Sequence, residues 1–150
     1  MTRETYSQLK SRHEKEYNEL SKDCVFFAFS NKQFEEGMEK LGLKPDETDK
    51  IYSIGHGGFI LRTKSKEQNE MFLRFIKEHQ QAIDNDTDGS GYIKEMFEYE
   101  MGNHEFGYTG DITDTLEALS LTMEEIRASE TLSNGYALAY ESYRKHYCED

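Results

Sequence analysis

The apolar positions in the first part of the chain switch between helical and strand spacing. Residues 6–20 place large side chains three or four positions apart, which predicts an amphipathic helix. The aromatic run 24–29 is typical of a buried strand. Ser30 and Gln33 predict a capping box at the start of a second helix, and Gly42 is the residue expected to end it.

A hairpin and a longer helix follow. Two short apolar runs, 51–55 and 59–61, flank a His-Gly-Gly turn and predict antiparallel strands. A phosphate-binding loop is the alternative for these glycines, but no Lys-Ser/Thr pair and no helix follow directly. Ser65 and Gln68 predict a capping box for the next helix. Its apolar positions share one face: Phe72, Phe75, Ile76, His79 and Ile83.

Helical patterns dominate the second half of the chain. They cover 93–102, begin again at Asp111, restart at the capping box of Thr122 with Glu125, and end in a tyrosine-rich stretch from 132 to 147. This last stretch could serve a dimer or the core. No repeat and no Pro/Ser-rich linker divides the chain, so we expect a single domain over 1–150. The fold class predicted is α+β, mainly helical, with a small antiparallel sheet from the N-terminal half.

The acidic residues are unevenly placed and change this picture. The chain of 150 residues carries a net charge of −12. Residues 84–130 hold 13 acidic side chains against Lys94 and Arg127, a net of −11, so the rest of the chain is close to neutral. Such a surface repels nucleic acid and favours basic partners or cations. The alternative is a surface that serves only solubility.

Cysteine usage and hydropathy bear on the compartment. The longest apolar run, 24–29, is far shorter than the roughly 18 residues of a membrane span, and no signal peptide precedes it. Two cysteines, Cys24 and Cys148, imply no disulfide framework, and Cys24 is expected to pack. We therefore expect a soluble, cytoplasmic protein with no membrane partner.

A calcium loop is the first candidate site. The segment 84–95 matches the EF-hand pattern D-x-D-x-D-G-x5-E, in which alternate residues of a tight loop supply oxygens to a hard cation. The candidate ligands are Asp84, Asp86, Asp88, Ser90 and Glu95.

Each register of this loop lacks one element of the motif. With Asp84 first, the aliphatic position is occupied by Gly91. With Asp86 first, the loop fits better, but Phe97 occupies the position of the bidentate carboxylate. The alternative is an acidic loop that caps the next helix, with Ser90 or Asp88 as the N-cap.

The second candidate is a set of carboxylates on the polar faces of the later helices. Carboxylates three residues apart rise about 4.5 Å each time along a helix and can imitate the regular charge of a DNA strand. The candidate partner-binding residues are Glu95, Glu98, Asp111, Asp114, Glu117, Glu124 and Glu125.

The segment 26–43 bears a family resemblance. Its aromatic strand, Phe-Glu-Glu helix start and Leu-Gly-Leu stop, followed by an acidic loop and Ile-Tyr-Ser-Ile at 51–54, resemble the N-terminal region of antirestriction proteins. The resemblance covers about 40 residues. Residues from Asp84 onward also resemble uncharacterised phage and mobile-element proteins that share Met-Phe-x-Tyr-Glu and Asn-His-Glu, here at 96–100 and 103–105.

Antirestriction proteins are acidic DNA mimics carried by mobile elements. The resemblance therefore implies a phage-type inhibitor that occupies the basic groove of a nucleic-acid-processing defence enzyme, such as a restriction or CRISPR enzyme, and does not bind nucleic acid itself.

Histidines provide an alternative of a different class. His13, His79 and His104 fall on apolar helix faces, and Glu100 lies four residues before His104, so these two could pair. Convergence of all four would make a metal site chemically feasible, whereas separate packing and hydrogen bonding would be structural. No HExxH, no Cys/His spacing and no nucleophile beside a base is present, so we expect no enzyme and no resident cofactor.

Overall fold

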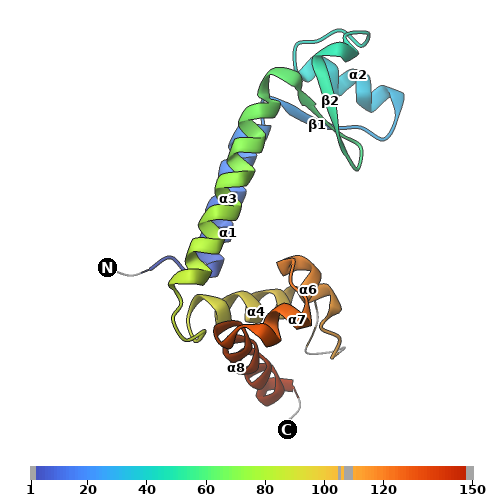
Figure 1. The fold of residues 1–150 in the computed structure, drawn as a ribbon. Coiled ribbons are helices and arrows are strands. Elements are labelled where there is room, and N and C mark those ends of the chain that lie inside the picture. Colours follow the sequence, from blue (N-terminus) through green and yellow to red (C-terminus); the bar gives the residue numbers. More distant parts are fainter. Residues whose placement is uncertain (1–2, 105, 107–109, 148–150) are drawn as a thin grey trace. The chain divides into compact units, whose positions relative to one another are not determined.

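A computed structural model of the chain describes residues 3–104, 106 and 110–147. The fold is α+β and mainly helical, with one three-stranded antiparallel sheet from the N-terminal half, which confirms the predicted class (Figure 1). None of the described helices combines the length and the apolar character that crossing a membrane requires.

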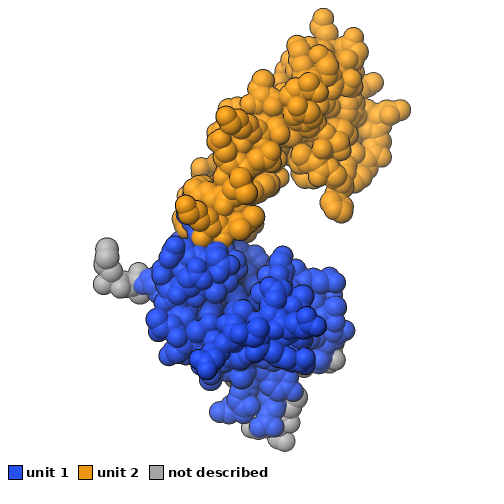
Figure 2. Space-filling view, viewed as in Figure 1, with its two compact units in different colours: residues 1–11, 78–150 blue, residues 12–77 orange. Residues whose placement is uncertain are grey.

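The chain divides into two compact units, which have different colours in Figure 2. Unit 1 comprises residues 1–11 and 78–150, and unit 2 comprises residues 12–77. Two helices, α1 (Tyr6–Ser21) and α3 (Ser65–Asn85), contribute residues to both units. The single domain expected from the sequence stays a prediction.

Unit 2 is built on the sheet, whose strand order is β1-β3-β2. Helix α2 packs on one face of the sheet, where Phe26, Met38 and Ile51 form a buried cluster. The other face buries Val25 and Ile60. Between α1 and α3 the elements are β1 (Val25–Phe27), α2 (Asn31–Lys40), the 3-10 turn Thr48–Lys50, β2 (Ile51–Gly55), β3 (Gly58–Leu61) and the 3-10 turn Arg62–Lys64.

Local sequence signals determine most boundaries in unit 2. Ser30 caps α2 by accepting a hydrogen bond from the backbone N–H of Gln33, as predicted. The reciprocal bond of the capping box is not formed, because the side chain of Gln33 accepts the N–H of Phe29 and not that of Ser30. Gly42 has φ 74°, and the N–H of Leu43 donates to the carbonyl of Met38, the C-terminal motif expected at this glycine. His56 and Gly57 both have positive φ, as a tight hairpin turn requires, and they join β2 to β3.

Two expectations for α3 are corrected. Ser65 has helical backbone angles and follows a 3-10 turn, so it is already inside the helical segment and is not an N-cap. The apolar face predicted for this helix is only partly covered. Ile76 is 66% exposed and Phe72 39% exposed, although both were assigned to one apolar face with Phe75.

Unit 1 is helical and has the largest core. Helix α4 supplies most of the fully buried side chains, including Tyr92, Ile93 and Phe97, and α8 and α6 pack against it. The capping box of Thr122 with Glu125 forms as predicted. Beside the parts of α1 and α3 that belong to it, the described residues of unit 1 form α4 (Tyr92–Asn103), α6 (Thr113–Leu119), α7 (Met123–Ala128) and α8 (Glu130–Tyr147).

A close backbone approach fixes the loop before α4 against α8. Gly89 has φ 83°, a conformation that side chains rarely adopt. A Cβ at Gly135 of α8 would stand 2.4 Å from Cγ2 of Ile93 and 2.7 Å from the carbonyl oxygen of Gly89. Both glycines are therefore required by the contact between the loop and α8.

Candidate functional site

The segment 111–130 is a strongly acidic part of unit 1. It carries six acidic residues and one basic residue, Arg127. On α6, Thr115 and Leu119 are buried in the core, whereas Asp114 and Glu117 are exposed. At 100° per residue these two carboxylates lie on the side of α6 opposite the buried pair.

Helix α7 and the segment before α6 extend this surface. Asp111 and Glu124 are exposed, as is Glu125, whose carboxylate also accepts the backbone N–H of Thr122 in the capping box. The backbone N–H of Thr113 donates to Asp111 and lowers the pKa of its carboxyl group. We call this set the α6–α7 acidic surface. It comprises Asp111, Asp114, Glu117, Glu124 and Glu125.

The other two candidate carboxylates are engaged with basic side chains. Arg3 donates two hydrogen bonds to Glu95, with N–O distances of 2.8 and 2.6 Å, and lowers the pKa of that carboxyl group. Glu98 lies 3.2 Å from the Nζ atom of Lys94. The structure therefore separates Glu95 and Glu98, whose charges are compensated, from the α6–α7 acidic surface.

The net charge of the protein is confined to unit 1. Unit 2 contains 12 acidic and 12 basic residues, whereas unit 1 contains 18 acidic and 6 basic residues and so holds the whole net charge of −12. Four of the six basic residues of unit 1 bind carboxylates of the same unit. They are Arg3, Lys10, Lys94 and Arg144.

The loop considered for calcium uses its carboxylates in backbone hydrogen bonds. One oxygen of Asp86 accepts the N–H of Gly89, and the other accepts the N–H groups of Gly91 and Ile93 at 3.1 and 2.9 Å. Asp86 thus caps the N-terminus of α4 from five residues before the N-cap position, Gly91. The alternative N-caps proposed from the sequence, Ser90 and Asp88, are wrong because they bond to each other.

The remaining candidate ligands point to other partners. Asp84 accepts a hydrogen bond from the amide of Gln80, and Glu95 is held by Arg3. Within the described residues, no three or more His, Cys, Asp and Glu side chains are grouped so as to hold a metal ion. The loop geometry therefore favours helix capping, and calcium binding stays a prediction.

Glu100 is the centre of a buried polar cluster in unit 1. Its side chain is 1% exposed, and Oε1 accepts hydrogen bonds from the hydroxyl of Tyr6 at 2.7 Å and from Nζ of Lys10 at 2.5 Å. Burial opposes ionisation of Glu100, but these hydrogen bonds and the charges of Lys10 and His104 outweigh it and lower the pKa. Burial and the bond to Glu100 raise the pKa of Tyr6.

The three histidines take three different kinds of partner. His104 Nε2 lies 3.4 Å from Glu100, which agrees with the pairing suggested by their spacing. His79 shares a 2.6 Å hydrogen bond with the hydroxyl of Tyr92, and His13 of unit 2 stacks on Phe75 with ring centroids 3.9 Å apart. Each histidine thus has a structural role of its own, and Glu100 is too enclosed to meet a substrate without rearrangement.

Two partners of these carboxylates were missed by sequence reasoning. Arg3 and Lys10 lie about 90 positions from Glu95 and Glu100, and nothing in their local sequence indicates the pairing. A signal did exist in Glu100 itself, because a carboxylate on the apolar face of a helix requires a buried cation or donor.

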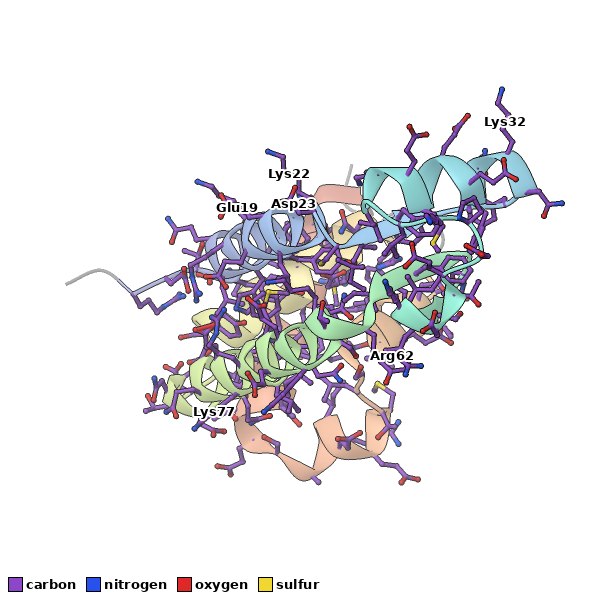
Figure 3. All side chains as sticks on the ribbon, turned by 90° about the horizontal axis from the view of Figure 1, so that it is seen from above. Glu19, Lys22, Asp23, Lys32, Arg62 and Lys77 are labelled. Carbon is purple, nitrogen blue, oxygen red and sulfur yellow. The ribbon has the colours of Figure 1, made fainter. Side chains whose placement is uncertain are left out.

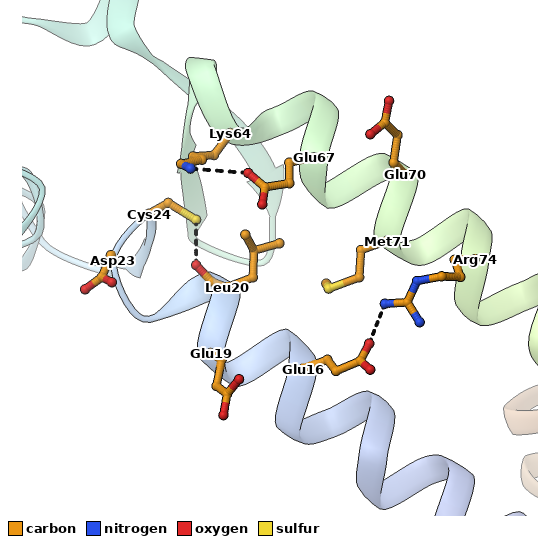
Figure 4. Close-up of a pocket in the computed structure, with 10 residues that line it drawn as sticks. All are labelled: Glu16, Glu19, Leu20, Asp23, Cys24, Lys64, Glu67, Glu70, Met71 and Arg74. Carbon is orange, nitrogen blue, oxygen red and sulfur yellow. Dashed lines mark hydrogen bonds and ion pairs between the residues drawn. The ribbon is translucent and has the colours of Figure 1, made fainter.

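Unit 2 contains an open cleft of about 690 Å³ between the end of α1 and the start of α3 (Figure 4). Cys24 lies at the cleft and is 1% exposed, and its thiol donates to the carbonyl of Leu20. Burial raises the pKa of this thiol, which keeps it protonated and weakly nucleophilic. Two ion pairs cross or edge the cleft. They are Glu16–Arg74 and Lys64–Glu67.

The tyrosines of α8 serve the core of unit 1 more than a free surface. Tyr136 packs edge-on against Phe97, and the hydroxyl of Tyr143 donates to the carbonyl of Glu98. Tyr140 is 44% exposed. The Tyr147 side chain, Glu105 and Cys148, which the sequence analysis also named, lie outside the described residues.

The fold and the candidate site together define a small α+β protein whose negative charge is gathered in one helical unit. The chain belongs to a protein family of unknown function (DUF7659), whose profile matches residues 5–142. No curated protein and no solved structure matches the chain.

Proposed function

We propose that the protein is a non-enzymatic inhibitor that presents the carboxylates of unit 1 to the basic nucleic-acid site of a defence enzyme. The observation that carries the proposal is the confinement of the entire net charge of −12 to unit 1, while unit 2 is neutral. A surface that serves only solubility needs no such separation, because charge spread over both units would have the same effect.

The α6–α7 acidic surface supplies the carboxylates for this contact. Asp114, Glu117 and Glu124 are exposed, and none of them has an ion-pair partner in the described part of the chain. Asp114 and Glu117 are three residues apart in α6, about 4.5 Å in axial rise, and Asp111 precedes this helix. A groove lined by Lys and Arg for phosphates would attract this row before any specific contact forms.

Repulsion between neighbouring carboxylates destabilises the folded protein, so a cluster of carboxylates without compensating cations supports a functional role. Like charges three residues apart on a helix destabilise it by roughly 0.2–0.5 kcal/mol per pair. The basic residues of unit 1 relieve this repulsion at Glu95, Glu98 and Glu100, but among the described residues they form no ion pair with Asp114, Glu117 or Glu124. The resemblance of residues 26–43 to antirestriction proteins supports a target among enzymes that act on DNA.

A capture experiment with matched variants tests the proposal. The tagged full chain is incubated with nuclease-treated bacterial lysate, and bound proteins are eluted either by salt or by duplex DNA at constant ionic strength. The test variant removes three charges from the α6–α7 acidic surface by D114N, E117Q and E124Q. The control removes the same number and kinds of charge from exposed positions of unit 2, by D46N, E35Q and E39Q.

Under the proposal, the wild type and the control capture a nucleic-acid-processing enzyme, which duplex DNA releases, and the test variant captures much less of it. Screening should weaken the contact steeply as salt rises. Equal capture by both variants, or a captured enzyme that duplex DNA does not displace, would contradict the proposal.

A further inference from the structure

The parts of α1 and α3 that lie in unit 2 have almost no buried core. Both buried residues of α1, Tyr6 and Leu9, belong to unit 1. The single buried residue of α3 is Gln68. Paired helices in water are stabilised mainly by burying an apolar face against each other or against a partner. The helical part of unit 2 therefore lacks the burial that such helices normally have.

Helix α3 also exposes large apolar side chains in this part of unit 2. Leu73 and Ile76 are each 66% exposed, and Phe72 is 39% exposed. Leu73 and Ile76 are three residues apart and Phe72 and Ile76 four, so the three side chains neighbour one another along one side of the helix. We call them the α3 stripe.

Two charges of opposite sign lie along one flank of the α3 stripe. At 100° per residue, Glu70 and Lys77 fall within about 20° of each other and roughly two turns apart. Neither has an ion-pair partner among the described residues. Glu70 leaves α3 on the side away from α1 (Figure 4), and Lys77 projects outward from the same helix (Figure 3).

We propose that the α3 stripe is the dimer interface of this protein, formed with an antiparallel α3 of a second copy. A twofold axis midway between Leu73 and Ile76 places each Leu73 against the second copy's Ile76. The same axis places Glu70 of each chain near the second copy's Lys77, with an offset of about two residues along the helix axis. In antiparallel pairs the same flanks meet, so two Glu70–Lys77 ion pairs border the apolar contact.

The charges also select the direction of pairing. In a parallel arrangement in register opposite flanks meet, so Glu70 and Lys77, which share one flank, would face the other flank of the second copy and form no ion pairs with each other. Only the antiparallel arrangement pairs opposite charges while keeping the α3 stripe buried. The resulting particle would carry two copies of the α6–α7 acidic surface, one from each chain.

Sedimentation equilibrium of the full chain over a range of concentrations tests the interface. The wild type should move from 17.6 kDa towards twice that mass as its concentration rises. L73E should raise the dissociation constant by about 100-fold, because each dimer loses two buried leucines worth roughly tenfold each. Far-UV circular dichroism should be unchanged, since Leu73 is exposed within one chain.

Charge reversal tests the register independently of the apolar contact. E70K alone and K77E alone should each weaken the dimer, whereas an equimolar mixture of the two variants should form a heterodimer with both ion pairs restored. E35K, an exposed reversal on α2, should have no effect. A wild type that stays monomeric, or a dimer that is insensitive to L73E and to both reversals, would overturn the proposal.

Discussion

Removing the cation from the buried Glu100 cluster should destabilise unit 1 far more than removing a cation from an exposed pair. In K10M the side-chain stem is largely kept, but Glu100, 1% exposed, loses its ammonium partner and keeps only Tyr6 and His104. Breaking a fully buried pair in this way costs about 3–5 kcal/mol. Because Lys10 is itself 41% exposed, we expect a smaller loss than this, about 2–3 kcal/mol.

The loss should depend on pH in a defined direction. In the wild type, the pKa of Glu100 lies below its ordinary value of 4.5, so its contribution to stability is present above that pH and is lost on further acidification. Without Lys10, burial dominates and raises the pKa of Glu100. The deficit of K10M should therefore be largest at neutral pH and should shrink as the pH falls towards 5, where the buried carboxyl group becomes protonated.

Urea unfolding followed by far-UV circular dichroism, at neutral pH and near pH 5, measures both effects. The matched control is K94M, since Lys94 pairs with Glu98 on the same helix but both side chains are about one-third exposed. This control should cost no more than about 1 kcal/mol at either pH. The reasoning is refuted if K10M is as stable as K94M, or if its deficit does not change with pH.

Three further outcomes are expected from the structure of the loop before α4. D86A should lower the free energy of unfolding by about 1–3 kcal/mol, because three backbone N–H groups lose their acceptor; a urea midpoint equal to that of the wild type would contradict this. Millimolar calcium should leave the melting temperature unchanged, and a calcium-dependent rise that D84N abolishes would instead support the EF-hand reading. G135A should destabilise by about 1–3 kcal/mol because its methyl group would overlap Ile93 and the carbonyl of Gly89, whereas stabilisation would mean that helix propensity outweighs the contact.

Features determined within a few residues could be predicted from the sequence. The capping box of Thr122 with Glu125, the stop at Gly42 and the hairpin turn at His56-Gly57 all depend on hydrogen bonds or backbone angles inside one short segment. The start of α3 was the exception, because a 3-10 turn carries the chain into the helix without a side-chain cap at Ser65.

Features that depend on distant segments could not be predicted in this way. The carboxylates of Glu95 and Glu98 have the same sequence signature as those of the α6–α7 acidic surface, yet Arg3, 92 positions away, compensates Glu95. Asp86 caps α4 because Gly89 turns the loop back towards the start of that helix. A sequence search that considers only the residues next to the helix start does not find such a cap.

The central claim concerns how the α6–α7 acidic surface acts on its target. The most direct measurement is the steady-state rate of the captured enzyme on duplex DNA, at several concentrations of DNA and of this protein. The account predicts competitive inhibition, in which the apparent KM for DNA rises while kcat is unchanged, and it predicts that the D114N, E117Q, E124Q variant loses this inhibition while the unit 2 control retains it. Inhibition that lowers kcat without changing the KM, or that survives in the D114N, E117Q, E124Q variant, would contradict the claim.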